Sequence, residues 1–180
     1  MDLARPGARL VVSTFSAADM FMVHAEPIRY AQSARLPYAP ELMFDMVADV
    51  ERYPEFLHEY RAVRIRSRTG DTWQVDQVIG FASVELTLRA VARLLRPESI
   101  IVRSSQMLLG DLEIRWDFEG AGTGTRVDFR MALSPPSRFA AGLAEHLLTK
   151  SATRTLEAFA ERARQLHGCG ADSPESARGA

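Results

Sequence analysis

The chain has 180 residues, of which 47% are hydrophobic and 25% charged, a mixture typical of one globular domain. Its 22 basic and 23 acidic residues give a formal net charge of -1, so we expect no specific DNA binding. The single cysteine, Cys169, excludes an intrachain disulfide framework and a cysteine-rich zinc site. No apolar run approaches the ~20 residues that span a bilayer.

The two ends of the chain differ from its middle. Residues 1–26 are expected to be a disordered leader or the result of a mis-assigned start, since Met20 and Met22 offer internal starts. Residues 168–180 are expected to be a disordered tail because they are polar and rich in small side chains. The ordered domain is therefore expected at residues 27–167.

The ordered part opens with a strand and a short helix. Residues 27–36 (PIRYAQSARL) alternate apolar and polar side chains, which predicts a strand. Pro40 and Glu41 then begin a helix that runs to Asp49, because proline suits the first helical position and an acid suits the first turn. The apolar positions predict a buried stripe of Leu42, Met43, Met46 and Val47.

A run of strands follows the short helix. Strict alternation is clearest in DLEIRWDFE (111–119), and it indicates a sheet with one solvated face, which is typical of antiparallel strands. The turn GAGTG (120–124) joins this strand to the next as a hairpin. The predicted strands span residues 59–68, 72–81, 83–94, 98–106, 111–119 and 125–133.

The chain closes with a long helix. Ser134 is expected to cap it, with Pro135 and Pro136 in the first turn, where missing amide donors do no harm. Gly168 is the expected stop. An apolar stripe at helical spacing is formed by Phe139, Leu143, Leu147, Leu156, Phe159, Ala163 and Leu166.

These elements predict an α+β fold, a curved antiparallel sheet that grips one long C-terminal helix, with short helices after the first strand. A strongly twisted sheet wraps around a helix without touching it everywhere, so we expect a space between them. Each inner side chain could be plain core or could line this space, with Gln77 as a polar tip. The expected lining is Trp73, Gln77, Phe81, Leu86, Leu88, Leu112, Ile114, Trp116, Phe129, Met131, Phe139, Leu143 and Leu147.

The size of that space decides between core and ligand cavity. A ligand pocket occupies roughly 300–1,000 Å³. An empty, dry void of about 400 Å³ would cost on the order of 10 kcal/mol at ~24 cal/mol per Å³, against a net stability of about 5–15 kcal/mol. A cavity of that size must therefore be filled with water, collapsed, or occupied by an apolar guest.

The stretch YPEFL (53–57) follows the short helix and has two interpretations. Phe56 and Leu57 could pack onto the sheet edge as ordinary core. Alternatively, they form the mouth of the cavity and dip into a membrane surface, so that a lipophilic guest enters without crossing water. Residues 107–109 (MLL) could form a second lip.

The sequence offers little for catalysis. Among the four histidines only His58 falls near the expected mouth, and no Ser/His/Asp arrangement or His-Glu-x-x-His pair is present. The glycines of residues 120–124 lie between two strands, whereas a phosphate-cradling loop needs a helix after it. We therefore predict no catalytic residue and no metal site.

Four segments resemble a known superfamily. They are LPYAPELMFDMVADVERYPEFL (36–57), VIGFASVELTLRAVARLLRPESI (78–100), LEIRWDFEGAGTGTRVDFRMAL (112–133) and EAFAERA (157–163). The chain resembles the START-like (helix-grip) superfamily, in particular its coenzyme Q-binding branch, which is grouped with polyketide cyclase/dehydrase domains and the RatA ribosome-association toxins. The resemblance implies a hydrophobic cavity for lipids, isoprenoid quinones or polyketide-like molecules.

The resemblance leads to three functional hypotheses. The first is a non-catalytic carrier or chaperone that binds an isoprenoid quinone such as ubiquinone, needs no cofactor, and supports respiratory electron transport. Such a protein would be cytoplasmic, with transient contact at the inner membrane. The second is a polyketide cyclase or dehydratase, which needs a polar or titratable group in the cavity. The third is ribosome association, for which Arg61, Arg64, Arg66 and Arg68 offer a basic strand.

Overall fold

The computed structural model describes residues 26–81, 84–106 and 110–168, without the side chains at positions 81, 84, 139 and 143–153. The predicted disordered ends lie almost entirely outside these residues, as does the second lip predicted at 107–109. The elements in chain order are β1 (Ile28–Leu36), α1 (Pro40–Ala48), the 3-10 helix η1 (Val50–Glu55), β2 (Tyr60–Thr69), β3 (Thr72–Phe81), β4 (Val84–Leu95), β5 (Ser99–Gln106), β6 (Gly110–Ala121), β7 (Gly124–Ser134) and α2 (Arg138–His167).

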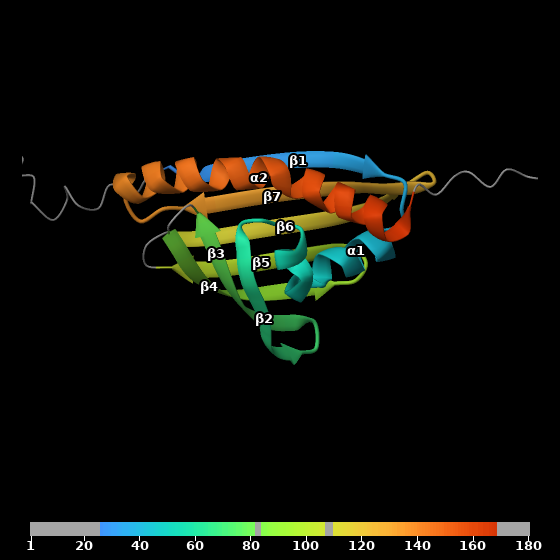
Figure 1. Ribbon diagram of the computed structural model, residues 1–180, viewed down its shortest axis with the longest axis horizontal. Coiled ribbons are helices and arrows are strands. Elements are labelled where there is room, and N and C mark those ends of the chain that lie inside the picture. Colours follow the sequence, from blue (N-terminus) through green and yellow to red (C-terminus); the bar gives the residue numbers. More distant parts are fainter. Residues whose placement is uncertain (1–25, 82–83, 107–109, 169–180) are drawn as a thin grey trace, which may run out of the picture.

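The strands form one 7-stranded sheet in the order β1-β7-β6-β5-β4-β3-β2, and all neighbours are antiparallel. Strands β2 to β7 form a meander in which each strand pairs with the next, and the last strand, β7, also pairs with the first, β1. Figure 1 shows α2 running along one face of the sheet, with α1 and η1 beside it. Contacts place α2 against β1 and β7 and place η1 against β2. The predicted α+β helix-grip architecture is confirmed.

The short helix α1 forms where the sequence predicts it. Pro40 occupies the first turn and Glu41 places an acid there, as a helix N-terminus favours. Met43, Met46 and Val47 are buried as expected, whereas Leu42 is only half-buried. Phe44, which was not predicted, is also buried, and its ring meets the edge of Phe118 at 5.7 Å.

The start of the long helix differs from the prediction. Ser134 is the last residue of β7 and pairs with Asp111, so it does not cap α2. The cap is Ser137, whose side chain accepts a hydrogen bond from the Ala140 amide at 3.2 Å. The two prolines belong to the connection, because the ladder with β6 holds the chain extended as far as Ser134. The predicted stop at Gly168 is confirmed, with the glycine in a left-handed conformation (φ 65).

The buried side chains form two clusters. The larger lies between α1, η1, α2 and the centre of the sheet, and includes Trp116 and Phe159. The smaller consists of Ile79, Leu88 and Leu133. Tyr60 and Leu112 are partly buried and pack against both clusters. The two clusters therefore meet at these two side chains.

Candidate ligand-binding site

An apolar cavity of ≈ 100 Å³ lies between the sheet and α2, next to Tyr60 and Leu112. Side chains on one face of a strand recur every second residue, so Leu112, Ile114 and Trp116 line it together from β6. The remaining described lining comes from η1 and the loop after it, from strands β2 to β5 and β7, and from α2. It comprises Val50, Tyr53, Leu57, Glu59, Tyr60, Gln77, Ile79, Leu88, Val102, Phe129, Met131, Thr155 and Phe159.

The structure brings many of the predicted site residues to this cavity. Those that line it are Leu57, Gln77, Leu88, Leu112, Ile114, Trp116, Phe129 and Met131. Phe56, Trp73 and Leu86 do not line it. The side chains of Phe81, Phe139, Leu143 and Leu147 lie outside the described part of the structure. Contact of any of these residues with a ligand stays a prediction.

Trp73 lies on the inner face of the sheet, as alternation predicts, but away from the cavity. It lies at the turn end of the β2–β3 hairpin, which projects away from α2 in Figure 1. Its ring packs against the edge of the core and lies under the Arg68 guanidinium, 4.4 Å from the ring centroid. Alternation gives the face on which a residue lies, but not how far along the strand the covering helix reaches.

In the YPEFL stretch Tyr53 and Leu57 are buried in the core, Phe56 is partly buried, and Pro54 and Glu55 are exposed. Leu57 is only 5% exposed, so the expectation of an exposed apolar lip is wrong for this residue. The buried Tyr53 donates a hydrogen bond to the Val47 carbonyl at 2.6 Å, which fixes its ring. Phe159 of α2 meets Tyr53 at 5.3 Å and Phe56 at 5.1 Å between ring centroids. Tyr53 and Phe159 form one wall of the cavity, and Phe56 lies behind Phe159.

Polar side chains also line the cavity, from its β2–β3 side. They are Glu59, Tyr60 and Gln77. Gln77 was predicted as a lining residue, whereas Glu59 and Tyr60 were not, because the sequence assigned them only to the start of a strand. Burial, together with the nearby charge of Glu59, raises the pKa of Tyr60 to about 12. At neutral pH the Tyr60 phenol is therefore protonated and can donate a hydrogen bond.

The cavity is smaller than expected. Its ≈ 100 Å³ is below the roughly 300–1,000 Å³ of typical ligand pockets and equals the liquid volume of about three waters. The assumed 400 Å³ is wrong for this conformation, because Tyr53, Trp116 and Phe159 fill part of the space. A whole isoprenoid quinone does not fit without displacement of one wall.

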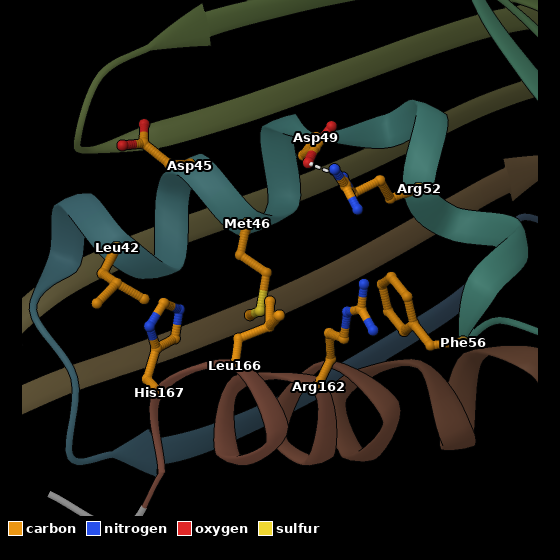
Figure 2. A pocket seen from close by; sticks show the side chains of 9 residues that line it. All are labelled: Leu42, Asp45, Met46, Asp49, Arg52, Phe56, Arg162, Leu166 and His167. Atoms are coloured by element: carbon orange, nitrogen blue, oxygen red, sulfur yellow. Dashed lines mark ion pairs between the residues drawn. The ribbon is translucent and has the colours of Figure 1, made fainter.

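A second hollow, the outer groove, has a volume of ≈ 310 Å³ and lies between α1, η1 and the C-terminal end of α2. Figure 2 shows Met46 and Leu166 facing each other across it, with Phe56 beside Arg162. Arg162 lies 5.4 Å from the Phe56 centroid and pairs with Glu55. The groove is lined by Leu42, Asp45, Met46, Asp49, Arg52, Phe56, Arg162, Leu166 and His167.

Phe56 connects the two hollows. It lines the outer groove, and it packs on Phe159, which lines the inner cavity. These two rings therefore lie between the apolar inner cavity and the more open, partly charged groove. On the far rim of the groove, two hydrogen bonds of 2.7 Å from Arg96 lower the pKa of the Asp45 carboxyl.

The structure also bears on His58, on metal binding and on membrane-spanning helices. His58 is exposed and does not line the cavity. Within the residues that the structure describes, no three His, Cys, Asp or Glu side chains gather closely enough to hold a metal ion. No helix in the described part of the chain is long and apolar enough to cross a membrane.

The basic strand β2 is an edge strand and is largely exposed. Arg66 pairs with Asp76 at 3.0 Å, and Arg68 covers Trp73. Arg61 donates to the His58 carbonyl at 3.4 Å. Arg64 is exposed, and Glu51 of η1 accepts a hydrogen bond from the neighbouring Ile65 amide at 3.1 Å. Part of the positive charge is therefore neutralised by local partners.

Comparison with known proteins identifies the family. The model of the family described as "Polyketide cyclase / dehydrase and lipid transport" matches residues 36–160. The chain is 28% identical over 140 residues, 76% of its length and 96% of the relative's, to the "Ribosome association toxin RatA" of Pseudomonas aeruginosa.

Solved structures agree with this assignment. The 18 kDa protein CC1736 of Caulobacter crescentus is 26% identical, with a TM-score of 0.63 over 78% of this chain and 99% of that one. The ZhuI aromatase/cyclase of Streptomyces sp. R1128 is 14% identical, with a TM-score of 0.72 over 82% of this chain and 100% of that one, and it shows the shared fold. The chain therefore belongs to the polyketide cyclase/dehydrase and lipid transport family, with the START-like helix-grip fold and RatA proteins among its relatives.

Proposed function

We propose that this protein binds a lipophilic small molecule between its sheet and α2 and acts as a non-catalytic carrier for it. An isoprenoid quinone such as ubiquinone is the first candidate. The observation that carries the proposal is the apolar cavity between sheet and helix that is lined by Trp116, Phe129 and Phe159. Affinity would come from apolar area removed from water, at about 25 cal/mol per Å².

Entry of such a guest needs movement of the Phe56–Phe159 partition. The inner cavity holds ≈ 100 Å³ and the outer groove ≈ 310 Å³. With Phe56 displaced, a guest could place its head in the cavity and its chain along Met46 and Leu166 of the groove. Transient delivery at the inner membrane would then proceed from the open groove.

Fluorescence titration tests this proposal. Trp116 lines the cavity and Trp73 does not, so we would replace Trp73 with Phe and titrate that variant with a short-chain ubiquinone. We expect saturable quenching of Trp116, together with a lipophile detected by native mass spectrometry of protein from its own host. The control variant Trp116→Phe, which keeps Trp73, should show no saturable quenching. Unchanged Trp116 emission and a ligand-free mass would end the proposal.

Ribosome association is the second candidate. It is favoured by the similarity to a protein named as a ribosome association toxin, which covers 96% of that relative. The exposed Arg64 on the edge strand β2 offers a contact for RNA phosphate. Cosedimentation with ribosomal subunits should fall steeply with salt and weaken in an Arg64→Ala variant. Salt-independent cosedimentation, or none, would contradict it.

The enzyme alternative, a polyketide cyclase or dehydratase, gains support from the acid and the phenol that line the cavity. Glu59 and Tyr60 meet its requirement for titratable groups there. It predicts that a linear aromatic polyketide precursor is converted to a cyclised or dehydrated product by the wild-type protein, and not by Glu59→Gln. Mass spectrometry of the products decides between this alternative and the carrier.

A further inference from the structure

Three polar side chains at the cavity lack hydrogen-bond partners among the described residues. Tyr60 is the first residue of β2, Glu59 directly precedes it, and Gln77 lies on the neighbouring strand β3. Tyr60 pairs with Ile79, two residues from Gln77, so the three lie on one side of the cavity. No described side-chain nitrogen or oxygen is both fully buried and without a partner, so the Tyr60 hydroxyl retains some accessible surface.

The chemistry of these groups determines what can satisfy them. Tyr60 offers one donor that remains protonated, Gln77 offers donors and an acceptor, and the Glu59 carboxylate only accepts. A polar group left unsatisfied in an apolar site is costly, so each needs water or a polar group of the guest. A guest with a polar head at one end therefore fits better than a pure hydrocarbon.

The charge at the cavity restricts that head further. No Arg, Lys or His side chain is among its described lining residues, and Glu59 is an acid. A carboxylate or phosphate head would face Glu59 without a countercharge, which like-charge repulsion and desolvation disfavour. A carbonyl head can accept from Tyr60 but offers nothing to Glu59. A hydroxyl head accepts from Tyr60 and donates to Glu59.

We propose that the cavity selects a neutral apolar molecule with a hydroxyl head, a phenol or alcohol, over its anionic and hydrocarbon counterparts. Tyr60, Gln77 and Glu59 are the specificity-determining residues. This inference rests on the proposed binding of a lipophilic molecule and names the class of head group it takes. For a quinone it means preference for the reduced, hydroxyl-bearing form over the oxidised, carbonyl-bearing one.

A matched ligand series tests the selection. Para-butylphenol, para-butylbenzoate and butylbenzene share one body and differ only in the head. Binding would be followed at pH 7 by NMR, using the indole N–H signal of Trp116, with titration to saturation. We expect the phenol to bind at least about tenfold more tightly than the benzoate and about 3- to 10-fold more tightly than butylbenzene, as one or two hydrogen bonds provide.

Substitutions at the cavity test which side chains cause the preference for a hydroxyl head. Tyr60→Phe should remove most of the phenol's advantage over butylbenzene. Glu59→Gln should narrow the gap between phenol and benzoate. Tyr30→Phe is the matched control, since its hydroxyl donates to Gln32 and it does not line the cavity. That variant should bind all three ligands as the wild type does.

The possible outcomes distinguish a failure of the head-group inference from a failure of the proposed binding of a lipophilic molecule. If none of the three ligands binds the wild-type protein, the proposed function fails and the inference falls with it. If butylbenzene binds but phenol and benzoate bind equally well, only the head-group inference is overturned. A phenol preference that persists unchanged in both cavity variants would also overturn it, because the selection would then come from other residues. These results use the wild-type protein first, so they do not depend on a variant that folds.

Discussion

Filling the cavity should stabilise the protein and block its ligand. Val102 of β5 lines the cavity and is partly buried, so Val102→Phe would place extra apolar atoms in the ≈ 100 Å³ space. At ~24 cal/mol per Å³ an empty space of this size costs about 2.4 kcal/mol, which is the ceiling of the gain. Incomplete filling and a new rotamer reduce it, so we expect a gain of about 1–2 kcal/mol in the free energy of unfolding.

Thermal and urea denaturation would measure this gain, which corresponds to about 2–8 °C in Tm for a chain of this size. In the same variant, butylbenzene binding should be lost. Val91→Phe is the matched control, because Val91 is 49% exposed and does not line the cavity; its stability should change by less than about 0.5 kcal/mol. The reasoning would be refuted if Val102→Phe bound butylbenzene as tightly as the wild type, or if its free energy of unfolding fell by more than about 1 kcal/mol.

Three further predictions concern a glycine turn, the cap of α2 and Tyr60 of the cavity. Gly124→Ala should lower the free energy of unfolding by about 1–3 kcal/mol, because the new Cβ would meet the Leu36 carbonyl. Gly120→Ala is the control and should lower it by less than about 0.5 kcal/mol, because its Cβ would make only an ordinary contact. Equal effects of the two substitutions would contradict the close approach at Gly124. Ser137→Ala should remove the α2 cap and lower stability by about 1 kcal/mol, and an unchanged midpoint would contradict the assignment. The pKa of Tyr60 is raised from 10.0 to about 12, so the folded state holds its proton while the unfolded state has lost it, and stability should fall as pH rises from about 10 to 12. Denaturation across this range should show a weaker fall in Tyr60→Phe, and an equal fall would argue against the burial of this phenol.

The sheet could be predicted from the sequence because alternation carries most of the information that fixes it. In β6, Leu112, Ile114 and Trp116 point inward as the pattern requires, since any shift by one residue would turn all of them to solvent. The start of α2 could not be predicted as well. Ser134 and Ser137 are both reasonable caps, and only the length of the β7 ladder decides between them.

The cavity itself could be predicted only in part. Alternation places Trp73 and Trp116 on the same face, but α2 covers only the second. Tyr60 and Glu59 were missed because a residue at the start of a strand gives no local signal of what lies above it. The volume of a cavity is a difference between large packed volumes, so a ring such as Phe159 changes it several-fold without changing the pattern.

The small volume of the closed cavity agrees with a binding role, because a larger empty space would be harder to maintain. At about 2.4 kcal/mol, the present void is tolerable within a net stability of about 5–15 kcal/mol. Opening the partition breaks the contact between Phe56 and Phe159, and an aromatic pair contributes about 0.5–1.5 kcal/mol beyond its buried area. Separating the rings also exposes the apolar area buried between them, so a guest opens the partition only if the apolar surface it buries, at about 25 cal/mol per Å², outweighs both losses. Guests with several isoprene-sized units should therefore open the partition, whereas a single ring should occupy the inner cavity and leave Phe56 in place.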